Sequence, residues 1–146
     1  MDDPVGISEV FDWTTVDDGV SVEVGDQTWT FATTEHYVPT LSVRVESGGR
    51  CFVFSADTGP NWSPAPTGEP VDLFLCESTF AERAGNEEIL HLSAGEAAEL
   101  AAAADVGHLV LTHLSPGQDP EAHAAAASAV FDGAISVAEV GATYSV

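Results

Sequence analysis

The sequence predicts a single α/β domain in which helices cover one face of a mixed β-sheet. Three observations support this. Apolar runs of strand length, joined by short glycine turns, fill the first half of the chain, and alternating strand-like and alanine-rich helical segments fill the second. The 146 residues, 45% of them hydrophobic, suffice for one core. No repeat or linker divides the chain, so we expect one domain over residues 1–146.

The first half is expected to form two hairpins and a buried strand. Val20–Val24 and Thr28–Thr33 flank the turn "GDQ", and Leu41–Glu46 and Arg50–Ser55 flank a short glycine turn. A loop rich in Pro, Gly and Ser follows and is too broken for a helix. The next strand is Val71–Cys76.

The second half is expected to form two strand–helix units. Ser93 and Glu96 have the spacing of a capping box, which predicts a helix that begins after Ser93 and ends near Gly107. Asp119 followed by proline predicts a second helix that ends near Gly133 and has His123 on its surface. The remaining predicted strands are Leu109–Leu111, Ile135–Val140 and Thr143–Val146.

The charge of the chain excludes some partners. Twenty-four acidic residues face three arginines and no lysine, for a net charge of −21. Such a chain repels polyanions, so we expect it to bind neither nucleic acid nor a membrane. Cys51 and Cys76 lie in apolar runs, and the N-terminus lacks the features of a signal peptide. Both observations predict a cytoplasmic location.

Several polar residues stand where strands end. Asp57, Glu77 and His113 follow the runs "FVFS", "DLFLC" and "LVLT", His36 follows the run at Thr28–Thr33, and His91 precedes Ser93. Side chains that follow the carboxyl ends of strands converge on ligands in α/β sheets. Imidazoles and a carboxylate that meet there suit a divalent cation such as zinc.

Each of these residues also has a purely structural interpretation. Asp57 can begin an Asx turn, Glu77 can cap the segment that follows, and His113 can be a core histidine. His91 can be an ordinary exposed residue before a helix. The coincidence of all of them at one sheet edge favours a site.

The segments around these residues resemble a known family. "TTEHYVPTLSVRVES", "CFVFSADTGP", "DLFLCESTF", "HLSAGEAAELA" and "LVLTHLSP", in this order, resemble the later half of the metallo-β-lactamase fold. They are most similar to its ribonuclease Z and cyclic-nucleotide phosphodiesterase branch. The resemblance implies half of an αββα sandwich and, in the complete fold, two metal ions, usually zinc.

The resemblance also implies roles for individual residues. His36 and His113 match histidine ligands of the first and second metal, and Asp57 matches the aspartate that bridges both. Glu77 and His91 match a pair that delivers a proton near the leaving oxygen. The implied chemistry is hydrolysis by a metal-bound hydroxide, with Asp57, Glu77 and His91 as catalytic residues.

The chain departs from the family in one major respect. The family's H-x-H-x-D-H motif is absent, because no histidine precedes His36. Three ligands cannot build two metal sites. We therefore expect a C-terminal half that begins at an internal methionine and is inactive, or binds metal weakly, alone. A missing N-terminal half or a second copy of the chain would have to complete it.

Further departures bear on the substrate. The turn after Leu41–Glu46 lacks the tRNA-gripping insertion of ribonuclease Z, so a small phosphodiester such as a cyclic nucleotide is expected as substrate rather than tRNA. Thioester or lactone hydrolysis, or a non-catalytic regulatory role, are the alternatives. Ala56 stands where the family often has glycine, an exchange that is tolerated if φ is negative there.

Overall fold

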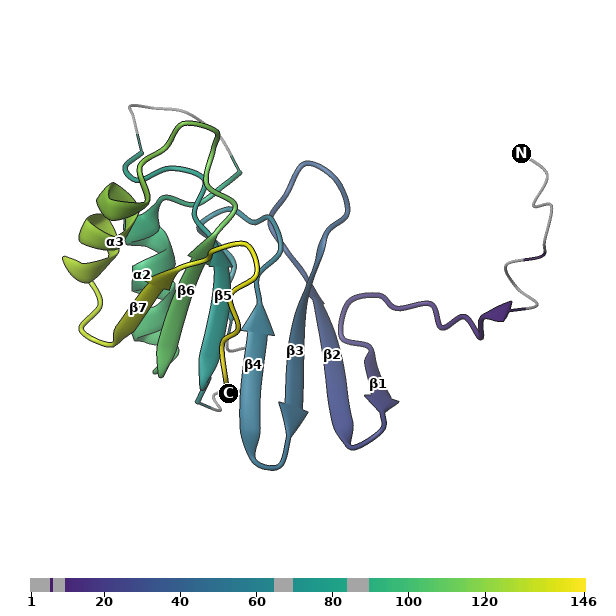
Figure 1. The fold of residues 1–146 in the computed structure, drawn as a ribbon. Helices are drawn as coiled ribbons and strands as arrows, with labels where there is room; N and C mark the ends of the chain where they lie inside the picture. The colour runs from purple at the N-terminus through teal and green to yellow at the C-terminus, as the bar shows by residue number, and fades with distance from the viewer. Residues whose placement is uncertain (1–5, 7–9, 65–69, 84–89) are drawn as a thin grey trace.

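The computed structural model describes residues 6, 10–64, 70–83 and 90–146. Seven strands form one mixed sheet, and their spatial order is their order in the sequence, β1 to β7 (Figure 1). Strands β1 to β4 pair antiparallel, and β4 to β7 pair parallel. The strands are β1 (Ser21–Val24), β2 (Gln27–Thr33), β3 (Leu41–Ser47), β4 (Arg50–Phe54), β5 (Leu73–Glu77), β6 (His108–Thr112) and β7 (Ala134–Val137). The predicted α/β fold is confirmed.

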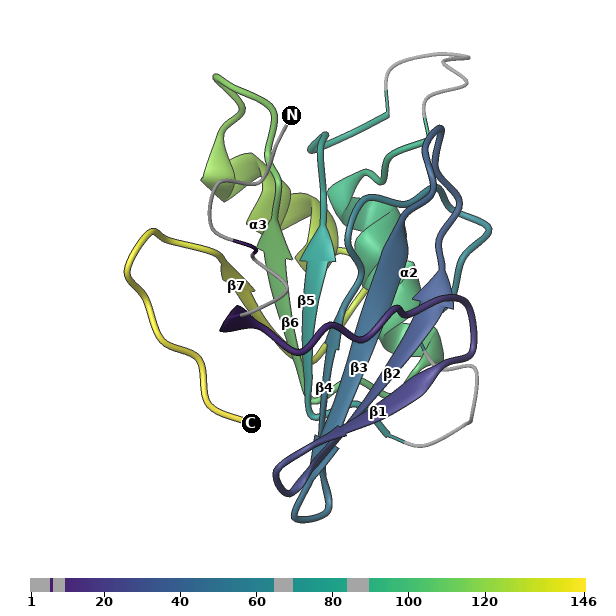
Figure 2. The ribbon, with the colours of Figure 1, turned by 90° about the vertical axis from the view of Figure 1, so that its right-hand side faces the viewer.

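Helices α2 (Ala94–Ala103) and α3 (Pro120–Ser128) pack on each other and over strands β5 to β7 (Figures 1 and 2). Most of the buried residues on the two helices are alanines, among them Ala97, Ala101 and Ala127, and His123 of α3 is buried with them. Small side chains let the helices approach the sheet closely, where they bury Phe74 and Leu111. Neither described helix has the length and apolar character that crossing a bilayer requires.

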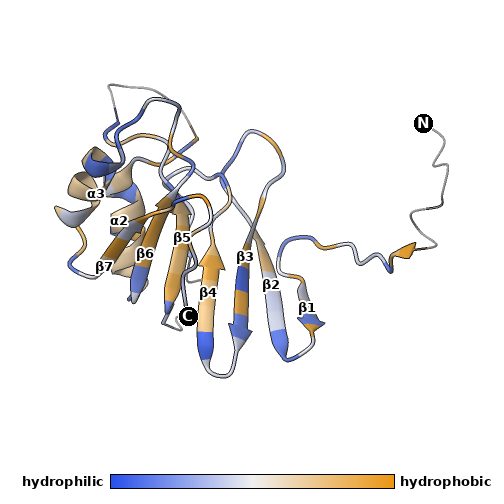
Figure 3. Ribbon diagram, viewed as in Figure 1, coloured by the Kyte–Doolittle hydropathy of each residue, from blue (hydrophilic) through white to orange (hydrophobic). Residues whose placement is uncertain are grey.

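The sheet has a second apolar face, which is less covered. On β3 and β4 the positions that face the helices are buried, whereas Val43, Val45, Phe52 and Phe54, which alternate with them, are only half-buried. Figure 3 shows the hydrophobic colouring along β4, β5 and β6. The C-terminal segment after β7 crosses this side of the sheet, where the Tyr144 hydroxyl donates a hydrogen bond to the carbonyl of Val137.

Three predicted features differ in the structure. Residues 143–146 form no strand, because the chain turns at Gly141, where φ is +85°, and leaves the sheet. Helix α2 stops before Gly107, because Asp105 takes the left-handed conformation (φ +50°) expected of that glycine. His123 is fully buried rather than at the surface, and its Nδ1 donates to the carbonyl of Asp119 one turn earlier.

Candidate metal centre and catalytic rim

The candidate site lies where four strands end at one edge of the sheet. Strands β2, β4, β5 and β6 run in the same direction, so their carboxyl ends share that edge. The segments after these strands carry His36, Asp57 and His113, and Glu77 is the last residue of β5. His91 joins them from the segment that enters α2. The structure thus brings all five predicted residues together.

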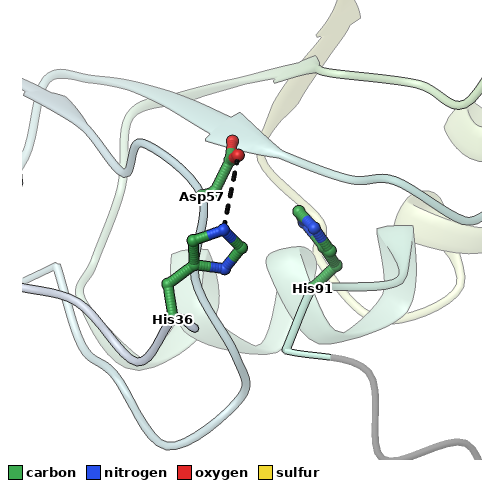
Figure 4. Close-up of side chains that lie close together, drawn as sticks. All are labelled: His36, Asp57 and His91. Atoms are coloured by element: carbon green, nitrogen blue, oxygen red, sulfur yellow. Dashed lines mark ion pairs between the residues drawn. The ribbon is translucent and has the colours of Figure 1, made fainter. Parts of the chain in front are cut away.

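Asp57 lies between two imidazoles. Its Oδ2 is 3.8 Å from Nε2 of His36 (Figure 4). Its Oδ1 is 3.7 Å from Nε2 of His113. Both separations are too long for hydrogen bonds. Two ligand atoms bound to one tetrahedral zinc ion lie roughly 3.4 Å apart, because each metal–ligand distance is about 2.1 Å. The spacing is therefore close to that of ligands around a cation.

The hydrogen bonds on the other side of each ring determine its tautomer. Nδ1 of His36 is 3.2 Å from the carbonyl of Leu90, which can only accept, so Nδ1 carries the hydrogen. Nδ1 of His113 is 3.0 Å from the Thr79 hydroxyl, whose own hydrogen goes to Glu77. When these rings are neutral, Nε2 of each therefore carries the lone pair.

Two lone pairs thus face the carboxylate oxygens of Asp57. Without a positive charge between them these atoms repel each other, so the donor set of His36, Asp57 and His113 fits a cation. His91 stands beside this set, since one of its ring nitrogens lies within 4.8 Å of donor atoms of both His36 and Asp57 (Figure 4). Imidazole and carboxylate ligands together suit zinc.

Glu77 is the buried hydrogen-bond acceptor that joins the segments of the site. Its side chain is 1% exposed. Oε1 accepts from the backbone N–H of Thr58 and from Nδ1 of His91, each within 2.9 Å. Oε2 accepts from the hydroxyl and the backbone N–H of Thr79, and from the backbone N–H of Leu92. These donors satisfy a carboxylate that would otherwise be costly to bury.

A second set of contacts fixes the segment that carries His91. Ser93 and Glu96 form the predicted capping box at the start of α2. The guanidinium of Arg83 bonds to both carboxylate oxygens of Glu96 and to the carbonyl of His91. Burial alone raises the pKa of Glu96, but hydrogen bonds from Arg83 and Ser93 outweigh it, so its pKa lies below the ordinary 4.5.

The backbone takes strained conformations at this edge. Ala56, directly before Asp57, has φ +51°, and His113 has φ +59°. The condition of a negative φ at Ala56 is therefore not met. Left-handed φ values cost non-glycine residues about 1–2 kcal/mol and cluster at functional sites. Here they turn the chain at the ends of β4 and β6, where Asp57 and His113 stand.

Sequence reasoning missed two residues that support the site. Thr79 joins Glu77 to His113, and Arg83 holds the His91 segment. Thr79 stands two residues after Glu77, a spacing that places both side chains on the same side of an extended segment. That spacing was a usable signal. Nothing local in the sequence pairs Arg83 with Glu96, thirteen residues away.

Residues 3–114 match the β-lactamase superfamily domain. Ribonuclease Z of Halobacterium salinarum is 34% identical over 137 residues, which are 92% of this chain and 42% of that protein. The probable metallo-hydrolase YhfI of Bacillus subtilis is 30% identical over 117 residues, which are 80% of this chain and 48% of that protein. The chain spans about half the length of the curated relatives it matches.

Solved structures support the same fold. The crystal structure of Bacillus subtilis YhfI superposes with a TM-score of 0.80 at 28% identity, over 87% of this chain and 53% of that chain. The short form of human tRNase Z superposes with a TM-score of 0.61 over 81% of this chain and 41% of that chain. Its 20% identity supports the fold alone.

Proposed function

We infer the chemistry of the site from two facts. The chain belongs to the β-lactamase superfamily, and its five predicted site residues, called the rim from here on, lie together at one edge of the sheet. We propose that His36, Asp57 and His113 hold divalent metal, and that the site serves the hydrolysis of a small phosphodiester. The observation that carries the proposal is Asp57, whose two carboxylate oxygens each face the lone pair of a different imidazole.

Zinc is the metal that this donor set fits best, and His36, Asp57 and His113 would hold it. A bound zinc ion supplies a hydroxide at neutral pH and stabilises negative charge on phosphate oxygens. The residues of the chain hold the ligands in place. Leu90 and Thr79 orient the rings of His36 and His113 through Nδ1.

His91 is proposed as the proton donor to the leaving oxygen. Glu77 accepts the hydrogen bond from its Nδ1, which leaves Nε2 as the atom that can exchange a proton with substrate. The ring of His91 lies between those of His36 and His113, with centroids at 5.0 and 5.3 Å. A proton donor in this place adjoins the groups proposed to bind metal.

A small phosphodiester is proposed because the chain offers little to a polynucleotide. The turn between β3 and β4 consists of Gly48 and Gly49, so no arm extends from it. A net charge of −21 repels a long polyanion. The names of relatives include ribonuclease Z, an RNA-cleaving enzyme by that name, and this supports phosphodiester chemistry as a class.

Metal binding by the 146-residue chain tests the centre. We expect the chain to bind zinc, measured by competition with a chromophoric chelator, and Asp57→Asn to weaken that binding at least about tenfold. Asp132→Asn, an exposed aspartate after α3, is the matched control and should leave it unchanged. Equal zinc affinity in wild type and Asp57→Asn would contradict the proposed metal centre.

Turnover tests the reaction. Three ligands leave the centre incomplete, so the chain alone should not hydrolyse bis(p-nitrophenyl) phosphate. Tight, stoichiometric zinc binding together with turnover of this substrate would contradict the expectation. Once a segment carrying H-x-H-x-D-H completes the site, phosphodiester, thioester and lactone substrates can be compared. Activity confined to thioester or lactone would replace the phosphodiester proposal, and activity on none would favour a binding role.

A further inference from the structure

We propose that Arg44 forms the core of a binding site for a small oxyanion, a carboxylate or phosphate group, at the end of the sheet opposite the metal rim. Arg44 lies on β3 and faces the helix side of the sheet. The proposal concerns a hollow that shares no residue with the rim.

The first observation is that two hydrogen-bond donors of the Arg44 guanidinium are unused. Arg44 is 7% exposed, and its Nη2 donates to Oε1 of Glu46 at 2.9 Å. Its Nε and Nη1 have no hydrogen-bond partner among the described residues. Arginine cannot lose its charge in a protein, and buried unmet donors of a charged group are costly. These two nitrogens therefore require acceptors.

The second observation is the hollow itself. It has a volume of about 300 Å³, and Arg44 and Arg50, two of the three basic residues of the chain, both line it. Asp72 also lines it, but its oxygens are already used, Oδ1 by Arg50 at 2.6 Å and Oδ2 by the N–H of Cys51 at 2.8 Å. Arg44 lines this hollow, and two of its donor nitrogens, Nε and Nη1, have no acceptor among the described residues.

The charges define the ligand. Arg44 and Arg50 balance Glu46 and Asp72, so the hollow is neutral before a ligand enters. An oxyanion offers acceptor oxygens to Nε and Nη1 and forms charge-assisted hydrogen bonds with them. The overall charge of −21 favours a singly charged ligand over a doubly charged one. Acetate and inorganic phosphate are the corresponding probes.

Thermal unfolding of the 146-residue chain tests the site. At constant ionic strength, we expect the melting temperature to rise saturably with acetate, phosphate or both, since a ligand that binds only the folded state stabilises it. Arg44→Met should abolish the rise. Without ligand this variant should be as stable as wild type or more so, because it removes a half-paired buried charge.

Two further variants act as controls. Ala102→Glu, at an exposed position of α2, changes the net charge by the same amount and should keep the response. Arg44→Lys keeps the charge but loses the planar fork, and should bind at least about tenfold more weakly. Should Arg44→Met fail to fold, the Nε–H resonance of wild-type Arg44 provides the readout and must shift saturably with the same anion.

Several outcomes would overturn the proposal. These are no saturable response to either anion, an equal response in Arg44→Met, and an unmoved Nε–H resonance at saturation. Glu69, which lies outside the described residues, is a carboxylate of the chain close in sequence to Pro70 of the hollow. An anion response that appears only in Glu69→Gln would show that the chain's own carboxylate occupies the site.

Discussion

Thr79 links Glu77 to His113 through two hydrogen bonds of its hydroxyl. Its hydroxyl donates to Oε2 of Glu77 at 2.8 Å and accepts from Nδ1 of His113 at 3.0 Å. Thr79→Val keeps the shape and removes both bonds. We expect a loss of about 1 kcal/mol in the free energy of unfolding, measured by urea, and a 10–100-fold loss of zinc affinity, measured by chelator competition.

Thr79→Ser is the matched control for this prediction, because it restores the hydroxyl. It should recover zinc affinity to within a few-fold of wild type. If Thr79→Val kept full affinity, the hydroxyl would have no part in orienting His113, and its bond to Glu77 would be structural only.

A substitution at Ala56 is expected to raise the free energy of unfolding, whereas Thr79→Val is expected to lower it. Its φ of +51° is strained for alanine, and glycine takes it freely. Ala56→Gly should therefore raise the free energy of unfolding by about 0.5–1 kcal/mol in urea titration. The same exchange at Ala102, an exposed helical residue of α2, should lower it by about 1 kcal/mol. A loss of stability at both positions would contradict the strain at Ala56.

The sequence identifies residues whose role follows from their place on a strand. Asp57, Glu77 and His113 stand at or just after strand ends, and parallel pairing brings those ends together. The partners of these residues depend on tertiary contacts that no local pattern records, as with Thr79 and His113, which are 34 residues apart. His123 was misplaced because an alanine-rich helix has no apolar stripe to indicate its buried face.

Helix α2 illustrates how one element holds the site. Its capping box orders Ser93 and Glu96, and Arg83 extends the same contacts to the carbonyl of His91. The capping box could be read from the sequence because its two residues are three positions apart. The helix end could not, since Asp105 rather than a glycine makes the left-handed turn.

The first turn of α2 predicts a dependence of stability on pH. The pKa of Glu96 is lower in the folded chain than the ordinary 4.5, so its stabilising effect is full above pH 4.5 and is lost as the pH falls through the folded pKa. Glu96→Gln should reduce the free energy of unfolding by about 1 kcal/mol at pH 7. The difference from wild type should shrink below pH 4.5.

Urea titrations between pH 7 and pH 3 measure this difference. Glu99→Gln, at an exposed position of the same helix, is the control and should change stability little at any pH. A deficit in Glu96→Gln that stayed constant down to pH 3 would mean that the carboxylate charge contributes nothing to the capping box.

At the scale of the whole molecule, the strand order and the side bearing the helices follow from the order of elements along the chain. Hairpins give the antiparallel pairs from β1 to β4. Strand–helix units give the parallel pairs β5–β6 and β6–β7, since each crossover helix returns the chain to the end of the sheet where these strands begin. The predicted strand Thr143–Val146 was wrong, because the apolar alternation in these residues gives no indication of the turn at Gly141.

The net charge of the whole chain leads to a prediction about how salt changes the melting temperature. Twenty-four acidic residues against three basic ones repel each other in the folded state more than in the expanded unfolded chain. Salt screens this repulsion within about 10 Å at 0.1 M. Raising NaCl from 10 mM to 0.5 M at pH 8 should therefore increase the melting temperature, by about 5 °C for a domain of this size. The increase should shrink as the pH falls from 8 to 5, toward the isoelectric point of about 4.1, because protonation removes the charges that salt screens. An increase of the same size at both pH values would assign the effect of salt to hydrophobic burial instead.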